Sequence, residues 1–416
     1  MYLKSSKRFK FSPKHKQILQ DLVISSDYPG SIIYDFDVLL EYIRDHDIVV
    51  TGKHQLPIRI LPEINAYLKH PLQVGLKRPQ QKSYPHIHGL YLLVRASGMA
   101  YVSVTSRKSF LQVDKAIYQV WEKLNPTERY GTLLETWLLR AKPEIIGEYD
   151  RSLLLVPENF QECFEFFSRI PGKGMKIAGD SDAELLLRYS PGFYNLGLLE
   201  MFGLIKVHHG SPEEGKGWRI KSILRTPFGD ALLALLFAKF FIDLANIFRL
   251  DDEGAVPFGT LQSVLFPYFS EWKNNLFIQE IGFREGVHIF KVLLGRICRQ
   301  IAIPSDHSLD SLASIILNSV NFDHDHLYQF SYKNRFGVLE YVYHPCMEEG
   351  PWASEVLVGD IGLSDGQKMT YLYDFGDQWQ FDVTLEKVDL AMVIENPIIL
   401  KAKGDPPKQY SMEDDY

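Results

Sequence analysis

Cysteines are few in this sequence and stand far apart. The 416 residues include Cys163, Cys298 and Cys346, and no two of them form a C-x-x-C pair. This spacing excludes a disulfide framework and a zinc knuckle. We therefore expect reduced thiols, with Cys163 and Cys298 buried among apolar residues.

Long apolar segments are also missing. The basic N-terminal stretch is followed by polar residues, among them Asp21 and Asp27, which interrupt any secretory h-region. The longest apolar run, residues 231–242, contains Lys239 and is shorter than the roughly 20 residues that cross a bilayer. We expect no membrane association and a cytoplasmic location.

Several nucleotide-binding and catalytic motifs are absent. There is no G-x-x-x-x-G-K-[ST] loop, and the nearest segment, PGKGMKIAGDSD, lacks both its spacing and its hydroxyl residue. H-E-x-x-H, G-x-S-x-G and the dinucleotide-binding glycine pattern do not occur either. We expect no organic cofactor, and we find no recombinase-type serine or tyrosine constellation.

The chain has no surplus of positive charge, since its formal net charge is -7. This value argues against a wholly basic surface, although a local patch would still bind nucleic acid. With 46% hydrophobic and 23% charged residues the composition is that of a globular protein. The length predicts more than one core. We place three domains at residues 1–142, 143–275 and 276–416.

The first domain is expected to alternate helices with short strands. A strand near Ile48, a helix after Pro57, a helix over 86–98 and an alternating segment over 100–113 follow in that order. In the helix over 86–98, apolar residues recur at i, i+3, i+4 and i+7 and form one face. The order resembles a winged helix whose wing is the hairpin turn at 105–108.

Basic residues surround this first module. They are Lys77, Arg78 and Lys82 before the expected recognition helix, Arg95 within it, and Arg107 and Lys108 in the wing. Cationic groups at these places would neutralise phosphates on either side of a groove. We therefore expect the first module to contact DNA.

A second module with a similar order of elements is expected over residues 183–240. A helix, a Ser-Pro-Gly turn and an amphipathic helix lead into a strand, the polar turn GSPEEGKG and a return strand. This order again resembles a winged helix. Glu200, Glu213 and Glu214 would repel phosphate, so we interpret this module as a protein-interaction copy.

Histidines occur in close pairs at 86/88, 208/209 and 324/326. In an extended segment, residues two apart face the same side, so His324 and His326 would point together. His86 and His88 begin a helix and would not. We expect solvent-exposed imidazoles or turn residues at these pairs.

From Gly286 the pattern changes to short strands around one helix, expected at 305–320. Strands joined locally around a helix indicate an α+β layer. The whole chain is therefore predicted to be α+β, with two mainly helical, winged-helix-like modules before a domain that has a mostly antiparallel sheet.

Two motifs in this last domain carry a family resemblance. They are H-L-Y-x-F at residues 326–330 and Y-x-Y-D-F-G-D-x-W at residues 371–379. Over roughly residues 286–410, their order and spacing resemble the plasmid pRiA4b ORF-three-like family. The resemblance implies an α+β fold, a mobile-element or defence context, and no settled biochemical activity.

The second motif permits two interpretations. Asp374 and Asp377 flank a Phe-Gly turn, and with His326 they would form a mixed nitrogen and oxygen site for a divalent metal. Alternatively, the two carboxylates cap the turn by accepting backbone N–H bonds, while Tyr373 and Trp379 pack across strands.

Departures from the family pattern favour the second interpretation. Phe381 stands where the resemblance implies a histidine, and residues 404–408 replace a cysteine-containing or acidic segment. Two polar ligands are thereby missing. The domain would keep its fold as a binding surface.

These observations predict a non-catalytic, nucleic-acid-associated or protein-interaction protein with a regulatory or accessory role. The alternative is a metal-dependent hydrolase or nuclease that uses His326, Asp374 and Asp377. A third hypothesis is an adaptor whose aromatic residues, 13% of the chain, bind another protein.

Overall fold

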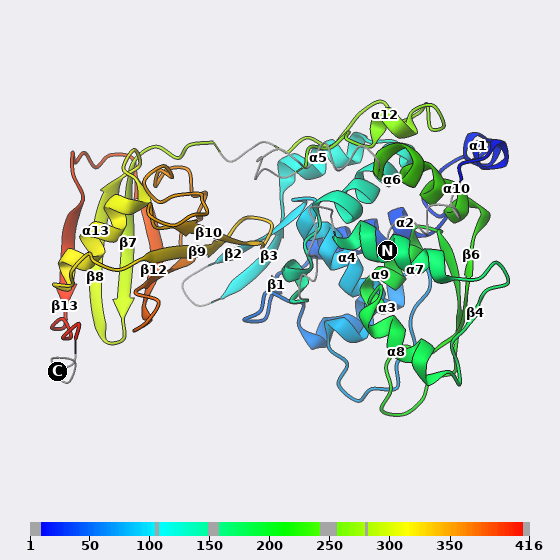
Figure 1. Cartoon of the computed structure of the whole chain (residues 1–416), viewed down its shortest axis with the longest axis horizontal. Helices are drawn as coiled ribbons and strands as arrows, with labels where there is room; N and C mark the ends of the chain where they lie inside the picture. Colours follow the sequence, from blue (N-terminus) through cyan, green and yellow to red (C-terminus); the bar gives the residue numbers. More distant parts are fainter. Residues whose placement is uncertain (1–9, 105–107, 149–157, 242–255, 279–281, 411–416) are drawn as a thin grey trace. The chain divides into compact units, whose positions relative to one another are not determined.

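The computed structural model describes residues 10–104, 108–148, 158–241, 256–278 and 282–410. The chain divides into two compact units (Figure 1). The N-terminal unit comprises residues 1–102 and 110–278, and the C-terminal unit comprises residues 103–109 and 279–416. Both expected helical modules fall within the N-terminal unit except for residues 103–109 of the first, which include its expected wing. A domain boundary at residue 142 stays a prediction.

The N-terminal unit begins with the elements of the first module. These are α1 (Pro13–Gln20), α2 (Ile32–Asp45), β1 (Ile48–Val49), η2 (Ile58–Ile60), α3 (Leu61–Tyr67), η3 (Gln81–Ser83), α4 (Pro85–Ala96), β2 (Ala100–Val104), β3 (Ser109–Val113), α5 (Lys115–Lys123), α6 (Pro126–Glu135), η4 (Thr136–Arg140) and η5 (Pro143–Ile146).

The second module and the end of the unit follow. Their elements are α7 (Glu158–Arg169), β4 (Met175–Lys176), α8 (Ser181–Tyr189), α9 (Phe193–Met201), β5 (Ile205–His209), β6 (Ile220–Arg225), α10 (Pro227–Leu236), η6 (Phe237–Phe241) and α12 (Gln262–Leu265). Among the described helices, none is both long and apolar enough to cross a membrane.

The two modules have small sheets of the same topology. The strand orders are β1-β3-β2 and β4-β6-β5, so in each sheet the third strand lies between the first and the second. In each module two helices, α3 and α4 or α8 and α9, separate the first strand from the hairpin. The order of elements expected from the sequence is therefore present in both modules.

Helix α4 is the centre of the N-terminal unit. Pro85 occupies its first turn, where no backbone donor is needed, and Gly98 at φ 74° follows its end. Every residue from Pro85 to Ala96 is buried, and α4 packs against α9. A helix that is buried all round belongs to the core, although α4 also carries His86, His88 and Arg95.

Glycines permit this close crossing of α4 and α9. A Cβ atom at Gly89 would lie 2.8 Å from Cγ of Leu198 and 3.2 Å from the carbonyl oxygen of Tyr194. At Gly197 of α9, it would lie 3.3 Å from the backbone N of His86. The helix expected to enter a DNA groove is thus covered by the corresponding helix of the other module.

The C-terminal unit is built on one antiparallel sheet of seven strands, in the order β10-β9-β11-β12-β7-β8-β13. Its elements are β7 (Val287–Leu294), β8 (Ile297–Pro304), α13 (Leu309–Ser319), β9 (Tyr328–Lys333), β10 (Leu339–Tyr343), β11 (Lys368–Tyr373), β12 (Trp379–Asp389) and β13 (Ile398–Lys403). The predicted α+β class and antiparallel sheet are confirmed.

Helix α13 supplies the apolar face that covers this sheet. Ser308 caps it by accepting a hydrogen bond from the N–H of Ser311 at 3.2 Å. Leu309, Leu312 and Ile316 are buried in a core shared with alternate residues of the strands, whereas Ile315 is only partly buried. The helix expected at 305–320 is therefore present, and its buried side faces the sheet.

The three cysteines are free thiols. Cys163 is buried as expected, and burial raises the pKa of its thiol well above the usual value. Cys298 is only half-buried because it lies in β8 beside the edge strand β13, so the expectation of full burial was wrong for it.

Candidate functional site

The second family motif forms the turn between β11 and β12. Asp374 has φ 59°, a left-handed conformation that Asp tolerates better than most residues. Its Oδ1 accepts hydrogen bonds from the N–H groups of Gly376 at 2.8 Å and Asp377 at 3.4 Å. The predicted capping role is confirmed for Asp374, whereas Asp377 is exposed and contributes its N–H.

The other motif residues belong to a polar cluster beside this turn. Nδ1 of His326 lies 3.5 Å from Oδ2 of Asp374, and its Nε2 lies 3.2 Å from the hydroxyl of Tyr410. The hydroxyl of Tyr410 donates to Asp323, and the hydroxyl of Tyr373 lies 2.8 Å from both the carbonyl oxygen and Oδ1 of Asp323. The cluster ties Gln409 and Tyr410 to the end of the sheet.

Electrostatics in this cluster favour a structural role. Desolvation alone would raise the pKa of Asp323, but hydrogen bonds from Tyr410, Gln409 and Tyr373 outweigh it and lower the pKa to about 2. The same carboxylate raises the pKa of Tyr410 to about 12. Tyr410 therefore keeps its proton at neutral pH and is not an activated nucleophile.

The remaining motif residue, Trp379, packs on the core. Its ring meets Phe322 edge to face, with centroids 4.9 Å apart. Among the residues that the structure describes, no three His, Cys, Asp or Glu side chains are grouped so that they could hold a metal ion. His326 and Asp374 form a pair that Asp377 does not complete.

The basic residues predicted for the first module have different fates. Lys77, Arg78, Lys82 and Lys108 are exposed, while Arg107 lies outside the described residues. Arg95 is only 2% exposed and lies within hydrogen-bonding distance of the hydroxyl of Tyr91. Its prediction as a nucleic-acid contact needs correction, because a buried guanidinium in a core helix cannot reach a phosphate.

The histidines of α4 also need correction. His86 and His88 are 3% and 2% exposed, so they are not the solvent-exposed imidazoles that we expected. Nε2 of His86 lies 3.0 Å from Oε2 of Glu200, which belongs to α9. Nδ1 of His88 lies 2.9 Å from Nε2 of Gln81, so one ring nitrogen of each imidazole has a polar partner inside the unit.

The basic loop that contains Lys77 is joined to the turn between β5 and β6. The N–H of Gly75 donates to the carbonyl oxygen of Lys216 at 2.9 Å, and the N–H of Gly215 donates to that of Gly75 at 2.8 Å. A Cβ atom at Gly75 would lie 1.9 Å from the carbonyl oxygen of Glu213. This backbone seam brings Lys216 onto the surface that carries Lys77 and Lys82.

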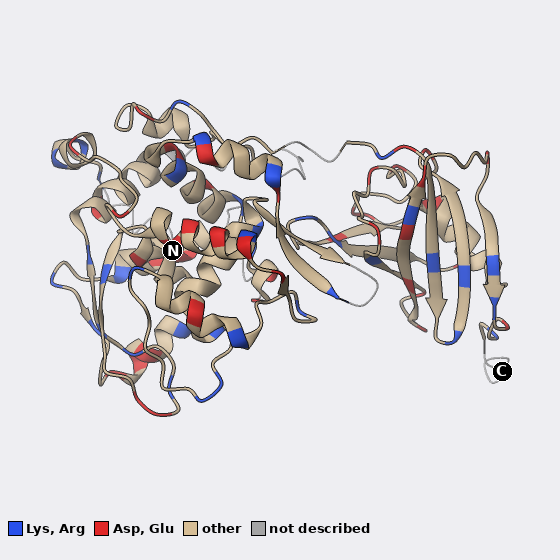
Figure 2. Ribbon diagram, turned by 180° about the vertical axis from the view of Figure 1, so that it is seen from behind, with Lys and Arg blue, Asp and Glu red and all other residues tan. Residues whose placement is uncertain are grey.

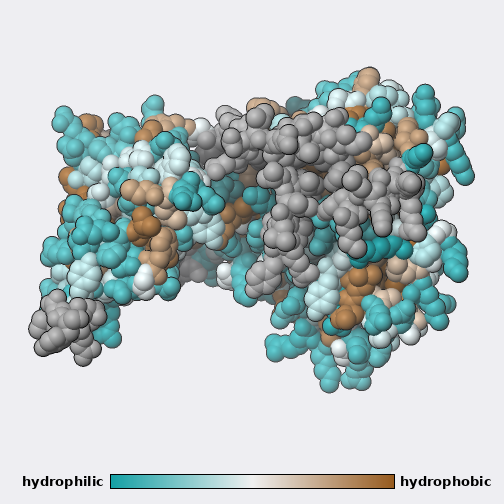
Figure 3. Space-filling model, viewed as in Figure 1, coloured by the Kyte–Doolittle hydropathy of each residue, from teal (hydrophilic) through white to brown (hydrophobic). Residues whose placement is uncertain are grey.

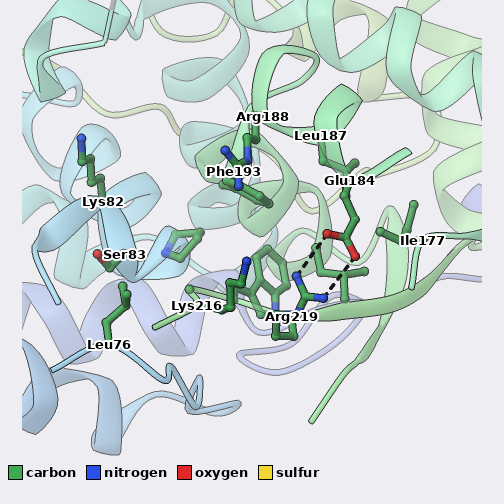
Figure 4. Close-up of a pocket in the computed structure, with 14 residues that line it drawn as sticks. Leu76, Lys82, Ser83, Ile177, Glu184, Leu187, Arg188, Phe193, Lys216 and Arg219 are labelled. Carbon is green, nitrogen blue, oxygen red and sulfur yellow. Dashed lines mark hydrogen bonds and ion pairs between the residues drawn. The ribbon is translucent and has the colours of Figure 1, made fainter. Parts of the chain in front are cut away.

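Beside the seam lies a pocket of about 460 Å³ (Figure 4). Its apolar wall is formed by Leu76, Pro85, Ile177, Leu187, Phe193, Trp218 and Ile220. Its charged lining consists of Lys82, Arg188, Lys216, Arg219 and Glu184. Four cations against one carboxylate leave a surplus of three positive charges, which favours an anionic ligand that also has an apolar part.

Within this pocket, one cation is neutralised by neighbouring carboxylates. Arg219 contacts both carboxylate oxygens of Glu184 at 3.2 Å, as the dashed lines in Figure 4 show, and its Nε lies 3.3 Å from Glu213. Lys82, Arg188 and Lys216 are exposed. These three side chains carry the charge surplus.

A hydrogen-bond network fixes the orientation of the pocket's tryptophan. Nε1 of Trp218 donates to Nδ1 of His209 at 3.3 Å, and Nε2 of His209 lies 3.3 Å from Oε1 of Glu200. Because an indole only donates, Nδ1 of His209 accepts and Nε2 carries the hydrogen toward Glu200. Desolvation would raise the pKa of Glu200, but hydrogen bonds from His209 and His86 outweigh it and lower the pKa to about 2.

Elsewhere the surface is mixed. Lys and Arg alternate with Asp and Glu over both units (Figure 2). On the face shown in Figure 3, hydrophobic residues form small areas among hydrophilic ones. The pocket has this surplus of cations although the whole chain has a formal net charge of -7.

Sequence reasoning identified Lys82 but missed most of this pocket. Arg188, Phe193, Lys216 and Trp218 are separated from Lys82 by more than a hundred residues in the sequence. Two glycines, Gly89 and Gly197, in the middle of apolar helices were the available signal that these helices cross closely. Of the three motif residues predicted to converge, His326 and Asp374 lie together, whereas the side chain of Asp377 is exposed and does not join them.

Comparisons with known proteins concern the C-terminal unit. Residues 291–411 match the family model described as plasmid pRiA4b ORF-3-like protein, which confirms the predicted resemblance for this part of the chain. The uncharacterized protein y4hQ of Sinorhizobium fredii is 25% identical over 118 residues, or 27% of this chain. The aligned region spans 58% of that relative's length.

A solved structure is also similar in sequence to part of this chain. It is the crystal structure of a protein of unknown function from Methanosarcina mazei, with 25% identity, and the match covers 30% of this chain and 72% of that one. The TM-score is 0.26.

Proposed function

We propose that this chain is a non-catalytic, nucleic-acid-associated protein that binds unpaired strands through its N-terminal unit. The observation that carries the proposal is the surplus of cations beside Phe193 and Trp218 in the pocket. Proteins that bind single strands combine such a positively charged surface with aromatic rings on which bases stack.

Burial of the central helices argues for unpaired strands over duplex DNA. A winged helix that reads a duplex places its recognition helix in the major groove. Here α4 is buried and packs against α9, so neither module offers that helix. What remains accessible is the loop with Lys77, Arg78 and Lys82 and the turn with Lys216.

The order of strands in the two small sheets supports a winged-helix-like ancestry for both modules. The sequence assigned phosphate binding to the first module and protein interaction to the second. The seam between Gly75 and Lys216 instead supports one surface to which both modules contribute. We expect a cytoplasmic protein with an accessory role, and the mobile-element or defence context implied by the family resemblance fits a nucleic-acid partner.

A non-catalytic role is supported by how the motif residues are used. Asp374 accepts backbone hydrogen bonds, Tyr373 and Tyr410 bind Asp323, and Trp379 packs on Phe322. Polar groups occupied in this way hold a turn and a chain segment in place. A hydrolase would need them directed at a substrate.

The proposal is tested by fluorescence anisotropy with labelled single-stranded and duplex oligonucleotides of equal length over a range of salt concentrations. We expect the single strand to bind more tightly. The triple variant Lys77→Ala/Arg78→Ala/Lys82→Ala should weaken binding and reduce the salt slope by about 0.7 for each phosphate that is no longer neutralised.

The matched control replaces three exposed lysines elsewhere in the unit, Lys53, Lys123 and Lys273, by alanine. It changes the net charge equally and should leave most of the affinity intact. Equal reductions of affinity in both triple variants, or no binding at low salt, would overturn the proposal.

A further inference from the structure

We infer that the pocket of about 460 Å³ binds a single nucleoside monophosphate unit, either free or at the end of a strand. The inference rests on the proposed function and narrows it to one chemical class of ligand. It assigns a phosphate position, a base position and a reason why one unit fits.

The phosphate position lies among Lys82, Arg188 and Lys216. These cations come from three separate segments: Lys82 from η3, Arg188 from α8 and Lys216 from the turn after β5. Figure 4 shows them around the pocket, with Arg219 engaged by Glu184. Because Arg219 is already neutralised by Glu184, the other three cations would bind a dianionic phosphate.

The base position lies along Phe193 and Trp218. Their ring centroids are 6.4 Å apart and their planes meet at 55°, so a flat base would stack on one ring and meet the other obliquely. Trp218 is 8% exposed and is held by His209, which fixes the plane of its ring. A preoriented ring lowers the entropic cost of stacking.

The size of the pocket favours one unit over a continuous strand. Its volume falls within the roughly 300 to 1,000 Å³ of small-molecule sites. The seam formed by Gly75 with Lys216 and Gly215 adjoins Leu76 and Gly217, both of which line the pocket. A cavity of this size suits one nucleotide unit, so a strand would enter it with its end.

Isothermal titration calorimetry with adenosine 5′-monophosphate and cytidine 5′-monophosphate tests the inference on the full chain. We expect both nucleotides to bind. Phe193→Ala should weaken the binding of both nucleotides about 5- to 100-fold, which corresponds to removing one base–aromatic stack. The control is Phe277→Ala, because Phe277 is 72% exposed and does not line the pocket.

Arg188→Glu provides a second variant with little risk to folding, since Arg188 is exposed. This substitution should weaken the binding of both nucleotides, and thermal melting should show that the variant is still folded. Nucleotide affinity that is unchanged in Phe193→Ala and in Arg188→Glu would overturn the assignment of this pocket.

Linear and circular single-stranded oligonucleotides of the same length separate the inference from the proposed function. Preference for the linear form, with competition by the free nucleotide, supports binding of a strand end. Equal binding of both forms with no nucleotide binding removes the inference and leaves the proposed function. Nucleotide binding without oligonucleotide binding removes the proposed function and supports a free ligand, and no binding of any probe removes both.

Discussion

The two units of this protein use their polar side chains in opposite ways. In the C-terminal unit, the polar residue of a distinctive motif stabilises the motif's own turn, because Asp374 accepts hydrogen bonds from the N–H groups of Gly376 and Asp377. In the N-terminal unit, ordinary loop residues such as Lys82 and Lys216 line a pocket beside Trp218. The unit with the recognisable sequence is thus the weaker candidate for binding.

The difference shows what a sequence motif can record. A tight turn with a left-handed residue accepts few residue types, so Y-x-Y-D-F-G-D-x-W is constrained by backbone geometry alone. A cationic side chain at the rim of a pocket needs only a positive charge and enough length to contact a ligand. Many positions in a sequence can provide such a side chain. Three sets of measurements test this difference between the two units.

The largest expected effect is the replacement of Tyr373 by alanine. Its ring is fully buried in the sheet core, so the cavity left behind should destabilise the C-terminal unit by about 3 to 5 kcal/mol. Tyr373→Phe removes only the hydroxyl bonds to Asp323 and should cost about 1 to 2 kcal/mol. Hydrogen exchange in β11 and β12 measures both changes.

Nucleic-acid binding by the Tyr373→Phe variant provides the accompanying check. If the motif is structural, oligonucleotide affinity should equal that of the unmodified chain. Loss of binding in a variant that remains folded would place function in the C-terminal unit and reverse the contrast.

An intermediate effect is expected from pH in the N-terminal unit. Glu200 has a folded pKa of about 2, below its usual 4.5, so its stabilising contribution is complete above pH 4.5 and is lost as the pH falls toward 2. The stability advantage over Glu200→Gln should therefore shrink by about 3 kcal/mol across this window. Hydrogen exchange in α9 follows it, and Glu122→Gln, at an exposed position, should show no such change.

The smallest expected effect distinguishes the charge of Asp374 from its shape. Asparagine retains an acceptor for the turn and tolerates a positive φ, so Asp374→Asn should be close to neutral in stability. Alanine has neither property, and Asp374→Ala should cost about 1 to 2 kcal/mol. Urea unfolding measures the difference, and equal destabilisation by both variants would show that the carboxylate charge matters through His326.

Sequence reasoning was most successful where structure is local. The helix that became α13 and the hairpin of β11 and β12 follow from periodicity and turn residues within one short segment. The antiparallel α+β domain could be predicted for this reason. In the N-terminal unit the order of helices and strands was also predicted, because capping and turn residues mark each element.

Burial in the N-terminal unit could not be predicted in the same way. His86, His88 and Arg95 made α4 look like a surface helix, yet all three are buried. Nε2 of His86 pairs with the carboxylate of Glu200, which is 114 residues away in the sequence. Long-range partners of this kind decide whether a polar residue is inside or outside, and one sequence without structure does not reveal them.

The seam at Gly75 also bears on the stage of synthesis at which the pocket is completed. The walls of the pocket come from residues 76–85 and 177–220. A ribosome releases the first wall long before the second, so a growing chain holds no complete pocket until Ile220 has emerged. A nucleotide could therefore bind in the pocket only after the two modules have packed against each other.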